Sequence, residues 1–316
     1  MTPETLEVSV RGKWVEVPAL WVDGQSIVIQ GKKIRIASLH DEEWLEEELR
    51  SPEACIKKLR EDSRVPRADI FTFSQKLPST EVRYRYPLEK RSVAVADVSN
   101  FANWWENLSQ VTRKNVRRAQ KRGVTLQVRS FDADVIRGIT EVQNESPIRQ
   151  GRRYPHFGKS FEQVKRDHGA FVDRSDFICA YCGAEFIGFL KLVYRGNIAS
   201  ILQLNSKAAH YDKRPSNALL AKAVELCEAK NISHLIYGKF NYGHSESSLR
   251  EFKERHGFYE MLVPEYYVPL TLWGRVCVWL HLYRGTMHLI PESVLSLARS
   301  LRSKWYSLKV NKAGVA

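Results

Sequence analysis

The segment Asn144–Lys159, with the sequence NESPIRQGRRYPHFGK, gathers residue types that bind anions. Guanidinium groups match the geometry of phosphate and carboxylate, and Tyr154 and Phe157 could form flat walls beside such a group. Segments that mix arginine and aromatic residues around Gly and Pro are often functional. A surface loop with ion pairs to acidic neighbours would have the same composition. The cationic candidates in this segment are Arg149, Arg152, Arg153 and His156.

A second candidate anion site precedes the helix expected over residues 216–230. A helix begins with unpaired N–H groups and a partial positive charge, which together favour phosphate. Pro215 suits the first turn, and a hydroxyl or amide there can orient nearby donors. A segment that only caps the helix would have the same features. The candidate phosphate ligands are Lys213, Arg214, Ser216 and Asn217.

A third cationic feature is the stretch TRKNVRRAQKRGV over residues 112–124. On a helix, its six Lys and Arg residues fall on one half of the cylinder, while Thr112, Val116 and Ala119 occupy the other half. Gly123 then provides the stop. The pattern predicts the last turns of an amphipathic helix, followed by a strand over 125–129. Its cationic face could contact phosphates of RNA or could simply be solvated.

The charge of the chain is concentrated in two segments. The formal net charge is +13 over 316 residues. Residues 113–153 hold 11 Lys or Arg against 4 acidic residues, and residues 270–316 hold 7 against 1. Such a distribution favours anionic partners. The hydrophobic content of 43% excludes long disorder and allows a full core.

Cysteine content and terminal features predict a reduced, cytoplasmic setting. The five cysteines are odd in number and irregularly spaced, which argues against a disulfide framework. Cys179 and Cys182 have zinc-knuckle spacing, but no second pair has it, so we expect no metal. The first residues lack the pattern of a signal peptide, and no apolar run reaches the length of a membrane span.

The expected elements fall into three parts. Residues 1–95 read as a small β-rich module with a hairpin at Asp23-Gly24. Residues 96–268 begin with the basic helix, from near Asn100. From residue 124 onward they read as a strand, two helices, three hairpin-linked strands, a helix, a strand, a helix and a strand. The helical crossover after the third hairpin strand predicts a mixed sheet with a parallel pair. Residues 269–316 read as a basic tail of two amphipathic helices.

The tail allows three interpretations. Its first helix, residues 272–283, would place Leu272, Val276, Trp279, Leu280 and Tyr283 on one face. Basic amphipathic helices with tryptophan can lie on an anionic membrane face, which would make the protein peripheral at the inner membrane. Packing on the protein's own sheet or on a second subunit explains the stripe equally well.

Three segments resemble a known superfamily. They are RKNVRRAQKRGV, SNALLAKAVELCEAKNISHLIYG and SSLREFKERHGF. With the element order over residues 100–268, they resemble the GNAT N-acetyltransferase superfamily, and most closely its Fem-type branch, which transfers aminoacyl groups from charged tRNA to peptidoglycan precursors. The resemblance implies an α/β (α+β) fold with the GNAT-like mixed sheet. It also implies transfer of an acetyl or aminoacyl group from acyl-CoA or aminoacyl-tRNA to an amine or hydroxyl of an anionic, cell-envelope acceptor.

The resemblance also implies roles for individual residues. Residues 213–217 would hold the donor, although CoA-binding members have glycines in this loop and this chain has none. The segment 144–159 would admit the acceptor, with Gln203 and Lys239 beside it. Tyr242 is the candidate general acid, and Tyr237 is a second tyrosine beyond the same strand. Glu141 and Glu145 are candidate bases acting through water.

A non-catalytic protein that binds RNA or anionic lipid through its basic faces is the alternative. A pocket joining residues 213–217 to Tyr242 and Arg149 would favour the enzyme, and a filled cleft would favour the binding protein.

Overall fold

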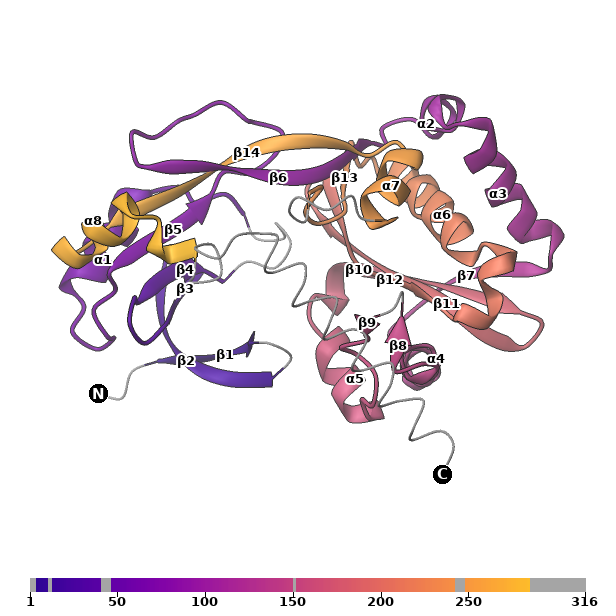
Figure 1. The fold of residues 1–316 in the computed structure, drawn as a ribbon, viewed down its shortest axis with the longest axis horizontal. Helices are drawn as coiled ribbons and strands as arrows, with labels where there is room; N and C mark the ends of the chain where they lie inside the picture. Colours follow the sequence, from indigo (N-terminus) through magenta and orange to yellow (C-terminus); the bar gives the residue numbers. More distant parts are fainter. Residues whose placement is uncertain (1–3, 11–12, 41–46, 150–151, 242–247, 285–316) are drawn as a thin grey trace. The chain divides into compact units, whose positions relative to one another are not determined.

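The computed structural model describes residues 4–10, 13–40, 47–149, 152–241 and 248–284 (Figure 1). The described residues form two compact units, one within 4–92 and 261–284 and the other within 93–260. Both boundaries fall inside long strands, β6 (Leu88–Asp97) and β14 (Tyr259–Pro269). The first unit thus takes in a later segment that the sequence division at 95 and 268 assigns elsewhere. The reason is that β14 pairs with β5, from Glu265 opposite Ser74 to Pro269 opposite Ile70.

The first unit is built on strands in the order β1-β2-β3-β4-β5-β14. The predicted hairpin at Asp23-Gly24 is confirmed, because both residues have positive φ and join antiparallel β2 and β3. Strands β4 and β5 are parallel and are connected through α1. The elements are β1 (Thr5–Val10), β2 (Lys13–Val22), β3 (Gln25–Gln30), β4 (Ile36–Leu39), α1 (Pro52–Glu61), β5 (Ile70–Ser74), α8 (Leu272–Trp279) and the short 3₁₀ turn η3 (Leu282–Arg284).

The second unit has the strand order β6-β13-β12-β11-β10-β7. Its strands are antiparallel neighbours except for β12 and β13, which are parallel and joined by α6. The predicted mixed sheet is therefore confirmed. Its further strands are β7 (Val124–Arg129), β10 (Ser175–Cys182), β11 (Glu185–Arg195), β12 (Ile198–Ser206) and β13 (His234–Ile236), and residues 148–153 form a small hairpin of β8 (Ile148–Arg149) and β9 (Arg152–Arg153).

Helices cover both faces of this second sheet. Alternate residues of β10 point to opposite sides, so Ile178 packs with α6 while Phe177 packs with α4 and α5. The helices are α2 (Phe101–Asn107), α3 (Gln110–Lys121), α4 (Ala133–Asn144), α5 (Phe161–His168), α6 (Pro215–Ala229) and α7 (Ser248–Arg255), with 3₁₀ turns η1 (Val172–Arg174) and η2 (Ala208–Lys213).

The basic stretch forms the predicted amphipathic helix, α3. Thr112 and Ala119 are buried, Val116 packs against the core, and the cations lie mostly on the exposed side. The chain turns at Gly123, whose φ of +78° favours glycine, and β7 follows. The buried face of α3 rests on α6, and this packing holds the cationic face of α3 toward solvent.

Candidate active site

The sheet of the second unit opens at the carboxyl half of β12. Parallel pairing with β13 covers only three residue pairs, from Ile198 opposite His234 to Ser200 opposite Ile236. Strand β12 continues to Ser206 and carries a bulge at Leu202, since Ile201 and Gln203 lie opposite the consecutive residues Leu192 and Lys191. A bulge re-aims the side chains and main-chain groups that follow it. Main-chain groups of β12 beyond Ser200 therefore border an opening that no described strand fills.

A pocket of about 500 Å³ lies at this opening. It joins the segment after α4, the end of β12, the start of α6, the residue after β13 and the helix α7. The lining residues are Arg149, Arg153, Tyr154, Pro155, Leu204, Asn205, Ser206, Tyr211, Ser216, Tyr237, Ser248, Leu249 and Phe252. The arrangement brings Arg149 of the predicted acceptor segment together with Ser216 of the predicted donor segment.

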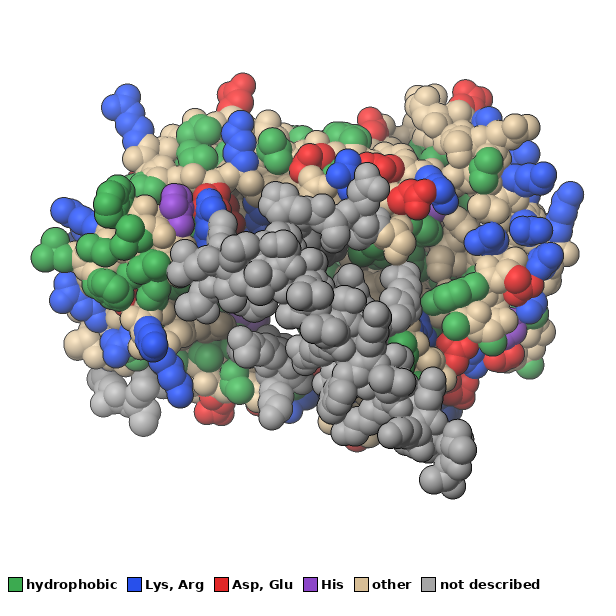
Figure 2. Space-filling view, in the orientation of Figure 1, with side chains coloured by type: hydrophobic (Ala, Val, Ile, Leu, Met, Phe, Trp, Pro, Cys, Tyr) green, Lys and Arg blue, Asp and Glu red, His purple; other side chains and the backbone are tan. Residues whose placement is uncertain are grey.

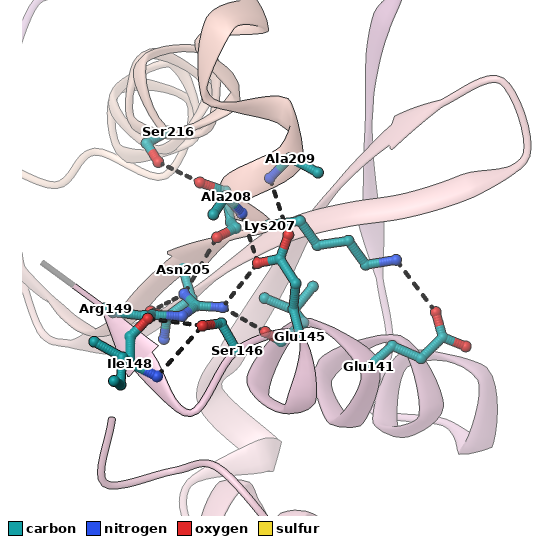
Figure 3. Close-up of polar contacts among 12 residues, drawn as sticks. Glu141, Glu145, Ser146, Ile148, Arg149, Asn205, Lys207, Ala208, Ala209 and Ser216 are labelled. Atoms are coloured by element: carbon teal, nitrogen blue, oxygen red, sulfur yellow. Dashed lines mark hydrogen bonds and ion pairs between the residues drawn. The ribbon is translucent and has the colours of Figure 1, made fainter. Parts of the chain in front are cut away.

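Arg149 is the residue that fixes one wall of this pocket (Figure 3). Its Nη1 donates to the carbonyl oxygen of Ser206 at 3.2 Å and approaches the side-chain oxygen of Asn205 at 3.5 Å, while Nη2 donates to the carbonyl of Val142. These contacts tie the segment after α4 to the end of β12. The Nε atom of Arg149 is buried and has no partner among the described residues.

Glu145 holds the start of η2. Its two carboxylate oxygens accept hydrogen bonds from the main-chain N–H groups of Ala208, at 2.6 Å, and Ala209, at 2.9 Å (Figure 3). Arg149 lies 3.6 Å away and completes an ion pair that is largely buried. Both oxygens are therefore occupied as helix caps. Glu141, one turn earlier, forms a more exposed ion pair with Lys207 at 3.5 Å.

Tyr154 stacks on the guanidinium of Arg149, with the ring centroid 4.3 Å from its central carbon. Its hydroxyl is buried and has no described partner, and burial raises the pKa of Tyr154 to about 12. The hydroxyl therefore stays protonated at neutral pH and is available as a donor. Arg153 is exposed at the pocket rim, and the side chain of Arg152 lies outside the described residues.

His156 packs beside Tyr154 and is not among the residues that line the pocket. Burial and the neighbouring charge of Lys159 lower its pKa to about 4, so it is neutral at physiological pH. Lys159 lies 3.2 Å from its Nδ1 and forms an ion pair with Asp167. Within the described chain, the contacts of His156 therefore stabilise the segment 144–159.

The start of α6 has an unusual conformation for a non-glycine residue. Arg214 has φ +61° and ψ +40°, in the left-handed region, and its side chain is exposed. Ser216 follows Pro215 and points toward β12, where its hydroxyl lies 2.9 Å from that of Ser206. Lys213 contacts Nδ1 of His210 at 3.0 Å. Of the four predicted phosphate ligands, Ser216 is the one that lines the pocket.

Asn217 turns away from the pocket into the core. Its amide nitrogen donates to Nε2 of His256 at 2.7 Å, and Nδ1 of His256 donates to the carbonyl of Phe252. Trp104 donates its indole N–H to the carbonyl of His256 at 3.0 Å. Burial lowers the pKa of His256 to about 4, so the neutral ring fits this network.

Tyr237 is the predicted catalytic residue that the structure places in the pocket. It follows β13, and its ring packs at 5.8 Å from that of Phe258. The ammonium of buried Lys253 lies 4.6 Å from the ring centroid and donates to the carbonyl of Lys239 at 2.7 Å. The side chain of Lys239 itself is exposed. Tyr242 lies outside the described residues.

Gln203 is connected to a buried polar chain behind β12. Its side-chain oxygen lies 3.5 Å from the amide nitrogen of Gln143, which is also 3.1 Å from Nε2 of His168. Burial lowers the pKa of His168 to about 3. Gln203 stands opposite Lys191, a buried cation that donates to the carbonyls of His168 and Ala170.

Several pocket residues were not predicted from the sequence. Leu204 and Ser206 come from β12, Tyr211 from η2, and Leu249 and Phe252 from α7. Leu249 and Phe252 are three residues apart on one helix. This spacing indicates that they share a face of the helix, but it does not indicate which part of the protein that face contacts. Ser206 could have been found as the last residue of the strand that enters the crossover.

The start of α6 does not fit a CoA pyrophosphate held by main-chain amides. The N–H groups of Arg214 and Asn217 donate to the carbonyls of Tyr211 and Arg214, and Pro215 has no N–H. A glycine-rich cradle offers several amides in a row, with no side chain between them and the phosphates. Among the described residues, no three His, Cys, Asp or Glu side chains are grouped as metal ligands.

Comparison with known proteins gives structural matches only. No protein-family model and no curated protein matches the sequence. The solved structure of FemX matches with a TM-score of 0.60 and 10% identity, over 88% of this chain and 91% of FemX. L-PGS from Bacillus licheniformis matches with a TM-score of 0.53 and 13% identity, over 84% and 87%. A conserved protein of unknown function from Bacteroides thetaiotaomicron has a TM-score of 0.54 and 10% identity, over 81% and 86%.

The chain has a GNAT-like, Fem-type fold. The resemblance expected from the three sequence segments is thereby confirmed at the level of the fold. The GNAT-like arrangement lies in the second unit, where α6 crosses between the parallel strands β12 and β13. The pocket sits at the carboxyl end of β12 in this Fem-type fold, where open α/β sheets commonly bind ligands.

Proposed function

We propose that this pocket transfers an acyl or aminoacyl group to an amine or hydroxyl of an anionic acceptor. The observation that carries the proposal is the convergence of Ser206, Ser216, Tyr237 and Tyr154 on the open half of β12. The Fem-type fold supports it, because the branch that the sequence resembles performs this reaction. The donor in this proposal is an activated ester or thioester.

The reaction needs a polarised carbonyl and a proton for the leaving group. The acceptor's lone pair attacks the carbonyl carbon, the new C–N or C–O bond forms, and the bond to the leaving oxygen or sulfur breaks. The acceptor releases one proton to water, and the leaving group takes up one proton. Leu204, Asn205 and Ser206 of β12 line the pocket beyond the last residue pair with β13, and a main-chain N–H of this stretch would suit the developing oxyanion. The leaving oxygen or sulfur requires a proton. In this proposal the hydroxyl of Tyr237, a residue of the pocket lining, donates it.

Two unpartnered donors support an anionic acceptor. The Nε of Arg149 and the hydroxyl of Tyr154 are buried, and both residues line the pocket. Buried polar atoms usually have hydrogen-bond partners, so a phosphate or carboxylate of the acceptor would complete both. Arg153 at the rim would add an exposed positive charge.

A polyanionic donor suits the surface next to the pocket. Arg122 at the end of α3 forms an ion pair with Asp212 of η2, which places the basic helix beside the start of α6. Arg118, Lys121 and Arg214 are exposed in these two elements. Side-chain cations spread along two elements match the phosphates of RNA better than one pyrophosphate. We therefore favour aminoacyl-tRNA over acyl-CoA as the donor.

One observation favours the second candidate, a protein that binds RNA without catalysis. The described lining of the pocket contains neither a carboxylate nor an imidazole to act as a base. The cationic face of α3 would then be the functional surface, and the pocket would bind the end of the nucleic acid.

A transfer assay separates the two candidates. We would supply aminoacyl-tRNA or acetyl-CoA with phosphate-bearing amines such as phosphoethanolamine and measure the acylated product. Tyr237→Phe should lower kcat about a hundredfold with little change in KM, whereas Tyr259→Phe, an exposed tyrosine outside the pocket, should not. Arg153→Ala should raise KM. No product with any donor, together with salt-sensitive RNA binding, would support the binding protein instead.

A further inference from the structure

A second surface of interest lies on α8 in the first unit, and it shares no residue with the proposed site. Among the exposed large hydrophobic side chains of the described chain, five lie between Leu272 and Leu280, while the others are dispersed from Val15 to Leu262. Leu272 and Trp279 are 78% and 79% exposed. The α8 patch is defined as Leu272, Trp273, Val276, Trp279 and Leu280. A contiguous apolar patch of this kind marks an interaction site more often than isolated residues do.

The patch faces outward because the opposite side of α8 is firmly anchored. Gly274 is buried against the main chain of Asp69. An added Cβ at Gly274 would lie 2.0 Å from the carbonyl oxygen of Asp69. Cys277, one turn later, is fully buried. Thr271 caps the helix by accepting from the N–H of Gly274 and donates to a carboxylate oxygen of Asp69, both at 2.9 Å. The helix therefore cannot rotate to bury its apolar side.

The segment after α8 is anchored as well. Tyr283 stacks on Tyr267 at 4.1 Å between ring centroids and donates to Glu89, and Arg284 donates to the same carboxylate at 2.6 Å. The sequence interpretation placed Tyr283 on the same face as Trp279, but the structure separates them. The helix ends at Trp279, and Tyr283 belongs to the 3₁₀ turn that follows.

Cations surround the α8 patch. Arg275 is exposed on α8 itself, and the indole N–H of Trp273 donates to the carbonyl of Lys33 at 3.2 Å, which places exposed Lys32 and Lys33 beside the patch. Figure 2 shows hydrophobic side chains gathered at the position of α8, with Lys and Arg side chains at their margin. The acidic groups in contact with this region, Asp69 and Glu89, are both engaged in the hydrogen bonds described above.

We propose that the α8 patch docks the protein on an anionic membrane surface. A bilayer with acidic headgroups offers hydrocarbon for the leucines and tryptophans and negative charge for Lys33 and Arg275 in one partner. Tryptophan suits the boundary between headgroups and hydrocarbon, because its ring is apolar and its N–H remains near polar groups. A second copy of the chain would instead bring two positive rims together, and residues 270–284 contain no acidic residue to neutralise them.

The docking is peripheral. No described helix is long and apolar enough to cross a bilayer. With only a short helix as the apolar anchor, the cations around it should contribute much of the binding, and added salt should weaken it.

The test uses the full chain with vesicles of phosphatidylcholine alone or mixed with phosphatidylglycerol, and measures the bound fraction by flotation. We expect binding to the mixed vesicles, with a blue shift of tryptophan fluorescence. The double variant Leu272→Ala, Trp279→Ala should lower the partition coefficient about tenfold. Trp21→Ala, which removes a half-exposed tryptophan of β2, is the matched control and should bind as the parent does.

A charge series tests the cationic rim. Lys33→Glu with Arg275→Glu should abolish the preference for phosphatidylglycerol, whereas Lys57→Glu with Lys58→Glu on α1 should leave it largely intact. Circular dichroism melts establish that each variant is folded. Equal partition of the α8 variant and the parent would overturn the proposal, as would absence of vesicle binding by the parent. A parent dimer in light scattering that the α8 variant converts to monomer would assign the patch to self-association instead.

Discussion

At the scale of single residues, the two carboxylate oxygens of Glu145 accept hydrogen bonds from two main-chain N–H groups. We therefore predict that Glu145 contributes to the stability of the fold. Glu145→Ala leaves the N–H groups of Ala208 and Ala209 without their acceptor and removes the ion-pair partner of Arg149. We expect the free energy of unfolding to fall by about 2 kcal/mol, as for a lost cap with a charged acceptor. Urea unfolding followed by circular dichroism measures it.

Glu141→Ala provides the comparison. Glu141 is on the same helix but forms an exposed ion pair with Lys207, for which we expect a change below about 0.5 kcal/mol. Equal losses for the two variants would mean that Glu145 does not hold η2.

His256 predicts how stability depends on pH. Its folded pKa of about 4 lies below the ordinary value of 6.5, so the unfolded chain takes up a proton first as the pH falls. The stability contributed by the neutral ring is therefore fully present above pH 6.5 and is lost as the pH falls toward 4, by about 1.4 kcal/mol per pH unit for one proton. His156 and His168, also with lowered pKa values, act in the same direction.

The measurement is urea unfolding at pH 7, 6, 5 and about 4.5. His256→Gln removes the titrating ring, and we expect a shallower decline over this range even though the variant is less stable at pH 7. Replacement of the exposed His40 by Gln is the control. An unchanged slope in His256→Gln would show that the ring does not carry this dependence.

At the scale of elements, the two ends of α6 make a matched pair. Arg214 before the helix and Asn231 after it both adopt left-handed backbone, with φ of +61° and +55°. Glycine relieves this conformation, so Arg214→Gly should stabilise the protein by up to about 1 kcal/mol, while Asn231→Gly should gain less because asparagine tolerates the region better. Thermal unfolding measures both effects.

The same pair separates stability from binding. Only Arg214→Gly removes a charge next to the pocket, so only this variant should bind RNA more weakly, with a smaller dependence on salt. If both variants bind RNA equally, Arg214 is not part of the donor surface.

The elements of the second unit were largely predictable from the sequence. The amphipathic pattern of residues 112–123 and the strand–helix–strand crossover gave α3, β12, α6 and β13, because local periodicity reflects which face is buried. The site was predictable only in part. Ser216 follows from its place at the start of a helix and Tyr237 from its place after a strand, but a sequence does not indicate where a side chain points. Asn217, predicted as a phosphate ligand, donates to His256, and Arg149 spends its Nη atoms on the main chain.

At the scale of the whole molecule, the boundary inside β6 gives a prediction about fragments. Val93, Ala94, Val95 and Ala96 are fully buried and belong to the second unit. A fragment of residues 93–260 should fold, whereas residues 98–260 lack the strand that pairs with β13. Loss of these side chains and hydrogen bonds should cost about 5 kcal/mol or more, which is comparable to the stability of a typical domain. Circular dichroism and amide exchange of both fragments test this.

The domain division could not be predicted from the sequence for a related reason. Composition changes smoothly through β6, and nothing local to residues 261–269 indicates that they pair with β5, almost two hundred residues earlier. Long-range strand pairing depends on the assembled sheet, whereas hairpins such as β2–β3 are encoded by the turn between them.

The central claim is that the pocket recognises an activated acyl group presented by a polyanion, and competition binding tests it most directly. The protein would be titrated with an RNA acceptor stem carrying an aminoacyl group in a stable amide linkage, with the same RNA lacking it, and with acetyl-CoA, each at low and physiological salt. We predict that the aminoacyl RNA binds several-fold more tightly than the bare RNA at both salt concentrations, and that acetyl-CoA competes poorly. Equal affinity for the two RNAs would contradict the account, because it would leave the pocket with no part in recognition.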